Sequence, residues 1–311
     1  MLHSSYQHTI AAAVAVSGIG VHSGAPAALT IKPAAANAGI VFIRTDITDR
    51  NNIIPAKWDR VADTRLCTVL ANDAGVTIST VEHVLSACAA SGIDNAVIEV
   101  NGPEVPIMDG SAIHFLDAIR TTGLRRLAAP RRYLRIKDTV TYTEGDKKAV
   151  LSPAEDAFYS FEIIFSNPVI GQQKYAHVFS EKTYRRDIAT TRSFGFLEDG
   201  LKLREMGLAR GSSLENAVVI DGDKVMNPEG LRFPNEPVRH KILDAIGDIF
   251  LCGHQIIGHY HGHKAGHAMN NKVLHALFAQ PEAFEIGPLA APAVKAPYAP
   301  AAEQARISVV A

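Results

Sequence analysis

Both halves of this 311-residue chain end in the same order of elements: a helix, a glycine, a strand, a loop and a second helix. Short strands separated by glycine, proline and asparagine precede this series in each half. The two series are residues 80–91, 93–100 and 111–122 in the first half, and residues 236–252, 254–261 and 266–279 in the second half. The repetition predicts an α+β fold with two similar domains in tandem, each a β-sheet with helices.

The segment at residues 123–132 is the best candidate for the boundary between these domains. Glycine, proline, small and basic residues occur there without periodicity, and the arginines around Pro130 indicate a solvated linker. We therefore expect a first domain over residues 1–127 and a second over residues 128–285. Residues 286–311 are rich in alanine and proline, which predicts a C-terminal tail.

The composition excludes several classes of protein. The formal net charge is −1 and no long basic run is present, so nothing indicates a nucleic-acid partner. No segment approaches the roughly 18 uncharged apolar residues that a membrane-spanning helix needs. Cys67, Cys88 and Cys252 are unclustered, which favours a reducing compartment, so the cytoplasm is the expected location. No coiled coil or apolar stripe calls for a partner subunit, and we expect a monomer.

The segment FPNEPVRHKILDAIGDIF, at residues 233–250, carries polar side chains at every fourth position: His240, Asp244 and Asp248. On a helix these three share one face, and isoleucines occupy the opposite face. His240 and Asp244 are about one turn apart, which is close enough to bind one metal ion. Asp248 lies roughly 12 Å from His240 along the axis, so it is better placed to orient a neighbouring side chain. An ordinary amphipathic helix with a solvated face explains the same pattern.

Glu82 and His83 stand side by side in the first turn of the helix predicted at residues 80–91. Ser79 and Glu82 fit a capping box, in which the glutamate folds back onto the N-cap amide and is purely structural. A helix N-terminus disfavours the imidazolium form of His83, so its ring stays neutral and can bind a metal ion. From this segment alone, a structural Glu82 and a catalytic Glu82 are both open.

The segment GHYHGHKAGHAMNN adds four histidines. His259, His261 and His263 alternate along a predicted strand and share one face, which fits either a metal site or ordinary surface residues. His267 opens the following helix. If it meets Asp248, the carboxylate would raise the pKa of His267 and hold an imidazolium ready as an acid or an oxyanion partner.

Two imidazoles and one carboxylate, with an open fourth position for water, are the ligand set of many catalytic zinc hydrolases. Bound zinc acidifies water, and a nearby carboxylate can take its proton during attack on a carbonyl. The chain lacks the HExxH helix of metalloproteases. Its ligands would therefore come from both domains, and the site would lie in the cleft between them.

Five separated segments resemble the UDP-3-O-acyl-N-acetylglucosamine deacetylase family, and the resemblance as a whole runs from about residue 8 to residue 280. In chain order they are STVEHVLSA, GIDNAVIEVNGPEVPIMDGSA, TRSFGF, GLRFPNEPVRHKILDAIGDIFLCG and GHKAGHAMNN. The resemblance implies a zinc amidase that removes the N-acetyl group of UDP-3-O-(3-hydroxyacyl)-N-acetylglucosamine in the committed step of lipid A biosynthesis. It also implies a fold in which the helices of two α+β domains pack together between two outer sheets.

The resemblance implies a role for each of the polar residues above. It implies zinc ligands at His83, His240 and Asp244, with Glu82 as the general base. It also implies that His267, oriented by Asp248, carries positive charge toward the oxyanion or the leaving amine.

The resemblance extends to the substrate. Ser193 stands where most members have a threonine beside the metal, which keeps the hydroxyl but loses the methyl group that restricts its rotamer. Lys241 matches a lysine that meets the phosphates of the nucleotide sugar, and Phe194 is also placed at the substrate. An insert at about residues 196–215 would form an apolar passage for the acyl chain. The leucines and methionine that would line it, with Leu201 and Leu203 foremost, are Leu197, Leu201, Leu203, Met206 and Leu208.

Two further hypotheses fit the same residues. A zinc amidase for another N-acyl sugar would use the same metal and carboxylate, because these do not specify the acyl group. A non-catalytic zinc-binding or nucleotide-sugar-binding module would need the histidines alone.

Overall fold

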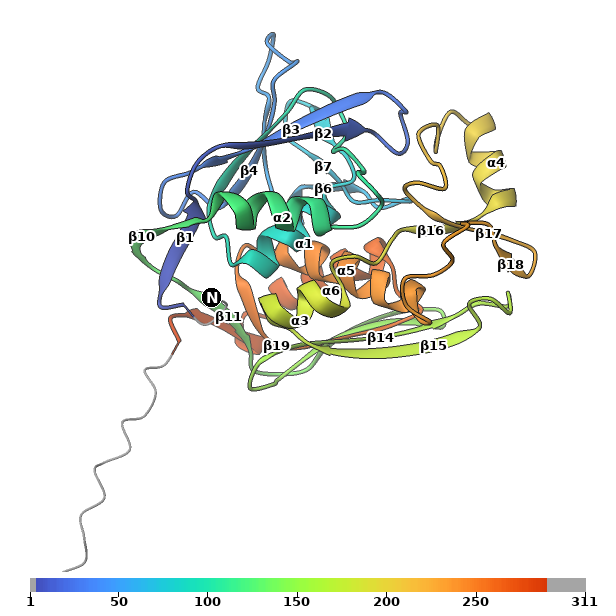
Figure 1. Cartoon of the computed structure of the whole chain (residues 1–311). Helices are drawn as coiled ribbons and strands as arrows, with labels where there is room; N and C mark the ends of the chain where they lie inside the picture. Colours follow the sequence, from blue (N-terminus) through green and yellow to red (C-terminus); the bar gives the residue numbers. More distant parts are fainter. Residues whose placement is uncertain (1–3, 290–311) are drawn as a thin grey trace, which may run out of the picture.

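A layer of helices lies between two β-sheets in the computed structural model, which describes residues 4–289 (Figure 1). The helices are α1 (Glu82–Ser91), α2 (Ile113–Thr122), α3 (Glu181–Asp187), α4 (Leu197–Glu205), α5 (Glu236–Phe250) and α6 (His267–Phe278), with 3-10 turns at Trp58–Arg60 and Pro281–Ala283. Helices α1, α2, α5 and α6 occupy the middle layer, and α4 projects at one side (Figure 1). No helix in the described residues is long and apolar enough to span a bilayer.

The sheet above the helices belongs to the first half of the chain. Its strands follow the order β2-β3-β9-β4-β5, and β9 pairs antiparallel with β3 and parallel with β4. These strands are β2 (Val14–Ile19), β3 (Pro26–Pro33), β4 (Ile40–Arg44), β5 (Ile53–Pro55) and β9 (Ala96–Val100). A small sheet beside it contains β6 (Val61–Asp63), β7 (Val69–Ala71) and β8 (Thr77–Ile78).

The sheet below the helices belongs to the second half. Its long strand β19 pairs with β11 and β14 in parallel and with β13 antiparallel. The strands are β11 (Tyr133–Ile136), β12 (Val140–Glu144), β13 (Lys147–Ser152), β14 (Ala157–Ile164), β15 (Gln172–Val178), β19 (Gln255–His263) and β20 (Phe284–Gly287). The remaining strands, β16 (Phe194–Phe196), β17 (Val218–Asp221) and β18 (Lys224–Val225), form a three-stranded sheet next to α4.

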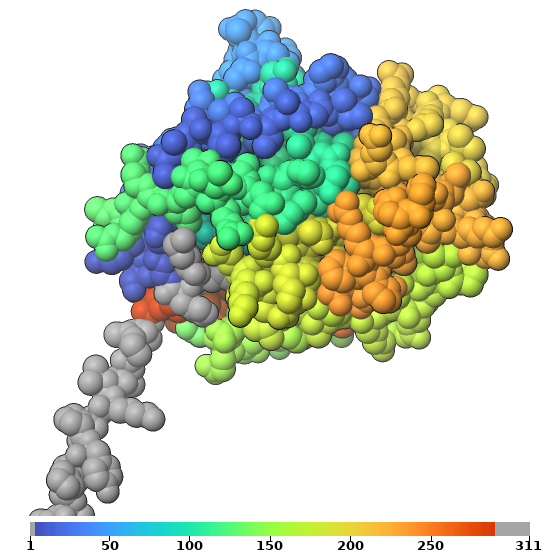
Figure 2. Space-filling view, viewed as in Figure 1, coloured from blue at the N-terminus to red at the C-terminus, as the bar shows by residue number. Residues whose placement is uncertain are grey.

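The predicted repetition is confirmed, because α1, β9 and α2 correspond in order to α5, β19 and α6. In each half the middle strand of the unit is an inner strand of its sheet. The first half of the chain makes up most of one side of the molecule and the second half most of the other (Figure 2). The α+β fold class and the sandwiched helices are therefore as expected.

Helices α1 and α5 approach unusually closely where the two halves meet. A Cβ atom added at Gly247 of α5 would lie 2.0 Å from the backbone oxygen of Glu82 in α1. Only a residue without a side chain fits at this crossing. Consequently α5 is buried on nearly all sides, and His240, Asp244 and Asp248 are each no more than 3% exposed. The interpretation of α5 as a helix with a solvated face is wrong.

The segment expected as a solvated linker is ordered. Leu124–Pro130 forms strand β10, which pairs antiparallel with β1 (Tyr6–Ile10). Arg131 is fully buried, and its guanidinium group lies 2.7 Å from a carboxylate oxygen of Asp94 and also contacts the Gly92 carbonyl at the end of α1. Its charge is tolerated there because it is paired and hydrogen-bonded. The domain boundary near residue 127 stays a prediction, although it falls within a strand.

The C-terminal tail was predicted to start at residue 286, which is earlier than the end of the last strand. Strand β20 extends to Gly287 and pairs antiparallel with β11 through Ile286 and Gly287. The alternating apolar residues Phe284 and Ile286 pack against the core, and this contact explains why the chain stays in the sheet beyond residue 285. The rest of the predicted tail, from residue 290 onward, lies outside the described residues.

Candidate metal centre and catalytic residues

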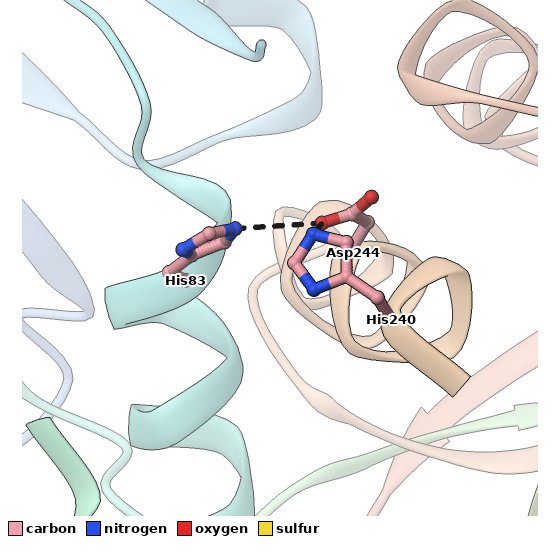
Figure 3. Close-up of side chains that lie close together, drawn as sticks. All are labelled: His83, His240 and Asp244. Atoms are coloured by element: carbon pink, nitrogen blue, oxygen red, sulfur yellow. Dashed lines mark ion pairs between the residues drawn. The ribbon is translucent and has the colours of Figure 1, made fainter. Parts of the chain in front are cut away.

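Three candidate metal ligands converge where α1 and α5 cross. His83 projects from the first turn of α1 toward His240 and Asp244 on α5 (Figure 3). The Nε2 atoms of His83 and His240 lie 3.6 and 3.2 Å from Asp244 Oδ1. Within the described part of the chain, these residues form the one group of three or more histidine, cysteine or acidic side chains whose ligand atoms lie within 4.8 Å of one another.

These residues fit a tetrahedral metal ion. Two ligand atoms about 2.1 Å from one ion in a tetrahedral arrangement lie roughly 3.4 Å apart, close to both observed separations. His240 Nδ1 lies 3.0 Å from the Thr191 carbonyl oxygen, which can only accept, so the proton sits on Nδ1 and Nε2 carries the lone pair that a metal ion requires. Burial lowers the pKa of His240 to about 3 and keeps the ring neutral, as metal binding requires.

Asp244 is held as a carboxylate. Its second oxygen, Oδ2, accepts a hydrogen bond of 2.8 Å from the Lys241 ammonium group. Burial alone would raise the pKa of Asp244, but His240 and Lys241 hold that pKa well below its usual range. The sequence did not predict this ion pair, in which Lys241 faces Asp244 within the same helix.

Glu82 is not part of a capping box. Helix α1 begins with Val81 as its N-cap, and no side chain caps it. The Ser79 hydroxyl donates instead to the Pro103 carbonyl, and Thr80 adopts a φ of 60°, which turns the chain away from cap geometry. Glu82 Oε2 accepts a 3.1 Å hydrogen bond from the Thr68 amide, so the carboxylate faces the interior. Burial raises the pKa of Glu82, which brings this carboxyl closer to the range of a general base.

His267 and Asp248 are in contact. His267 Nδ1 lies 2.8 Å from Asp248 Oδ2, and His267 Nε2 lies 4.0 Å from Glu82 Oε1. Burial alone would lower the pKa of His267, but Asp248 outweighs it and raises that pKa to about 9. The ring is therefore an imidazolium at neutral pH, with one N–H on Asp248 and the other directed toward Glu82.

Comparisons with known proteins identify the family of this chain. The model of the UDP-3-O-acyl N-acetylglycosamine deacetylase family matches residues 7–279. The chain belongs to this deacetylase family. It is 49% identical to a UDP-3-O-acyl-N-acetylglucosamine deacetylase of Phenylobacterium zucineum over 90% of this chain and 96% of that protein. Proteins of the same name from Myxococcus xanthus and Shewanella woodyi are each 48% identical, over 93% and 90% of this chain and 91% and 92% of theirs.

Next to the candidate metal-binding group of this deacetylase-family chain lies an apolar cavity of about 620 Å³. Glu82, His83, Ser193 and Lys241 are among the residues that line it. Ser193 Oγ lies 3.3 Å from His240 Nε2, so its hydroxyl is beside the candidate metal position. The other lining residues include Cys67, Phe194, Phe196, Leu197, Leu201 and Leu203.

The insert predicted at about residues 196–215 contributes a wall of this cavity. Leu197, Leu201 and Leu203 of α4 line it, whereas Met206 and Leu208 are not among its lining residues. Met206 is instead 73% exposed beyond the end of α4. Phe194 and Lys241 both line the cavity, and the Lys241 ammonium nitrogen lies 5.7 Å from the centre of the Phe194 ring.

The alternating histidines of β19 are not part of the candidate metal group, and side chains of the neighbouring strand β14 satisfy them. Ser160 Oγ of β14 lies 2.7 Å from His259 Nε2 and 2.8 Å from His261 Nδ1. His263 Nδ1 lies 3.0 Å from Glu162 Oε2. These hydrogen bonds give the three side chains a structural use, and we assign no metal to them.

The sequence patterns missed several polar residues around the candidate catalytic groups. Thr68 and Asn270 both bind Asp248, and Thr191 holds His240 through its backbone carbonyl. Buried Glu236 at the start of α5 binds Arg192, the neighbour of Ser193, at 3.0 Å. The pairs are distant in sequence and follow no spacing rule. Only the segment GHAMNN, which contains Asn270 near His267, offered a signal.

Proposed function

We propose that the chain is a zinc-dependent hydrolase that removes the N-acetyl group from UDP-3-O-(3-hydroxyacyl)-N-acetylglucosamine and releases acetate. One observation carries the proposal: in a chain of this deacetylase family, a buried His-His-Asp group lies beside a buried glutamate and a His–Asp pair, and Glu82 and His83 line an adjoining apolar cavity. Membership of the family connects the reaction to lipid A biosynthesis.

Zinc is the proposed ion because two imidazoles and a carboxylate leave one position of a tetrahedral site open, where the metal acidifies water and polarises a carbonyl. His83, His240 and Asp244 would hold it. The proposal is supported by the neutral state of His240 and the ionised state of Asp244, since both must be deprotonated to bind metal.

The side chains divide the remaining work of amide hydrolysis. Glu82 accepts a proton from the attacking water molecule while the oxygen of that water bonds to the carbonyl carbon of the acetyl group. The negative charge that develops on the carbonyl oxygen is met by the imidazolium of His267 and by the hydroxyl group of Ser193. The carbon–nitrogen bond then breaks, acetate leaves, and the amine takes a proton from His267 or from Glu82.

The remaining groups bind the substrate. We assign the acyl chain to the apolar cavity, with Leu201, Leu203 and Phe194 along it, because a chain of methylene groups gains about 0.8 kcal/mol for each CH₂ that it buries. Lys241 would approach the diphosphate. Its pairing with Asp244 supports a second effect, in which it helps to keep that carboxylate ionised.

The proposal is tested with purified protein and two substrates, one with the 3-O-acyl chain and one without it. We expect acetate release that chelation abolishes and zinc restores, and a kcat/KM that falls at least about tenfold without the acyl chain. Equal rates on both substrates would favour a zinc amidase for another N-acyl sugar. Metal binding without any turnover would favour a non-catalytic module.

We further propose that the protein acts as a monomer in the cytoplasm. The location is supported by Cys67, Cys88 and Cys252, which are all buried, free thiols. The monomer follows from the sequence, in which no coiled coil or apolar stripe calls for a partner subunit. Sedimentation at the concentrations used in the assay tests the monomer, and a dimer with full activity would overturn it. Fractionation of cells tests the location.

A further inference from the structure

Thr68 contacts two carboxylates that belong to different helices. Its backbone amide donates to Glu82 Oε2 on α1 at 3.1 Å, and its hydroxyl group donates to Asp248 Oδ1 on α5 at 2.6 Å. The residue lies immediately before β7 and is 1% exposed. One residue of the first half therefore connects the proposed general base with the partner of the proposed acid.

The carboxylate of Asp248 is bound at both oxygens, and each donor has a separate position. Oδ2 accepts from His267 Nδ1 and from the Asn270 amide, each at 2.8 Å. The amide must face Asp248 with its nitrogen, because a carboxylate only accepts, and the Tyr260 hydroxyl then donates to its oxygen. In the described structure, Thr68 supplies the one side-chain donor to Oδ1.

Thr68 is also set back from the substrate. The cavity is lined by its neighbours Leu66 and Cys67, whereas Thr68 is absent from the lining and turned toward α5. Leu66 adopts a φ of 71°, a left-handed conformation that bends the chain just before Thr68. The residue is thus placed to act on Asp248 and not on the substrate.

We infer that Thr68 is a positioning residue of this enzyme, whose hydroxyl group fixes the carboxylate of Asp248 so that His267 stays directed at Glu82 and the reacting amide. The inference rests on the proposed roles of Glu82 and His267. Removal of the hydroxyl leaves a buried carboxylate oxygen without a donor, which is costly. The carboxylate then rotates or recruits another donor, and the ring of His267 loses its fixed direction.

The test compares Thr68→Val and Thr68→Ser with the unaltered zinc enzyme. Valine has nearly the same shape as threonine and keeps the backbone amide on Glu82, while serine retains the hydroxyl. We expect Thr68→Val to lower kcat about 10- to 100-fold, the range typical of residues that orient catalytic groups, with KM and zinc content almost unchanged. Thr68→Ser should restore most of the rate.

A matched control is Thr9→Val. Thr9 is likewise fully buried, but its hydroxyl group accepts a hydrogen bond from the Ala34 amide. Thr9 belongs to β1 and is far in sequence from the residues of the site. It should leave kcat unchanged. If Thr68→Val does not fold, Thr68→Ala removes the same hydroxyl without new bulk and replaces it in the comparison.

A second measurement asks whether Thr68 acts through Asp248. In an Asp248→Asn background, the further change Thr68→Val should cost less than about twofold, because the group that it positions has already been lost. The inference would be overturned if the losses of kcat caused by Asp248→Asn and Thr68→Val multiplied in the double variant. It would also be overturned if Thr68→Val left kcat unaltered, or if Thr68→Ser were as slow as Thr68→Val. Failure of the proposed function is distinguishable, since the unaltered enzyme itself would then lack turnover.

Discussion

Glu82 is buried, ionisable and hydrogen-bonded to a backbone amide, yet it belongs to no helix cap. We expect Glu82→Gln to retain zinc and lose turnover by about 10²- to 10⁴-fold, because the amide cannot accept the proton from water. Asp244→Ala should lose zinc as well as turnover. Metal analysis and acetate release distinguish the two variants. Glu99→Gln, a partly exposed glutamate paired with Lys32, is the control and should behave as the unaltered enzyme.

His267 determines the expected alkaline limit of the rate. Its pKa is raised to about 9, so the imidazolium is present below pH 9 and is lost as the pH rises through that value. The profile of kcat against pH should therefore fall near pH 9 on its alkaline side. His267→Gln should lower the rate and remove this limb. A limb that remains in the variant would show that another group is the acid.

At the level of single residues, chain spacing predicts only contacts within one helix. The four-residue spacing predicted that His240 and Asp244 lie close enough to bind one ion and that Asp248 lies apart. In the structure the first two belong to the candidate metal group and Asp248 does not, while the binding of an ion stays a prediction. The partners from other elements had no such signal. Thr68 meets Asp248 across 180 positions of sequence, and no periodicity or composition connects them.

Among the elements, α1 and α5 cross at a point where their backbones nearly touch. We expect Gly247→Ala to cost about 1–3 kcal/mol of stability, because the added Cβ would lie 2.0 Å from the Glu82 carbonyl oxygen and must push the helices apart. The same displacement separates His83 from His240, so zinc affinity should fall with the melting temperature. Calorimetry and zinc titration measure the two effects.

The control for this substitution is Gly200→Ala in α4. Apart from its chain neighbours and the backbone of its own helix, no atom lies within 4 Å of a Cβ built at Gly200, so the change should leave stability equal or raise it by up to about 1 kcal/mol. A melting temperature of Gly247→Ala equal to that of the unaltered protein would contradict the proposed crossing.

The existence and order of the elements could be predicted, but their surroundings could not. Periodicity predicts one apolar face for α5, and it is silent on whether a second helix covers the polar face. Here α1 covers it, which turns the expected solvated residues into buried ones. The alternation of Gln255–His263 likewise predicted a strand but not its parallel pairing with β14, since the partner depends on the path of the whole chain.

At the scale of the whole molecule, we expect the burial of His177 to make the folded protein less stable in acid. The ring is 2% exposed, and its Nε2 has no hydrogen-bond partner among the described residues. Burial lowers the pKa of His177 to about 4, below the value near 6.5 of an unfolded histidine. The contribution of neutral His177 to the free energy of unfolding is therefore complete above pH 6.5. It declines as the pH falls from 6.5 toward 4, by about 1.4 kcal/mol for each pH unit at most.

His177→Phe isolates this effect. The ring lies beside Tyr175 and Phe179, so phenylalanine suits its surroundings and does not titrate. The free energy of unfolding of the variant should change less between pH 7 and pH 5 than that of the unaltered protein, as measured by denaturant titration. Equal slopes in the two proteins would exclude His177 as the source of acid sensitivity.

The division of the ligands between α1 and α5 has a consequence for biosynthesis. During translation His83 emerges well before His240 and Asp244, and a nascent chain that ends before α5 offers one ligand of the three. We expect such a chain to bind zinc weakly, because high affinity depends on ligands that folding brings together. Metal uptake would then wait until synthesis has passed α5 and the helices have crossed, so that a tightly bound ion reports a chain translated through both halves.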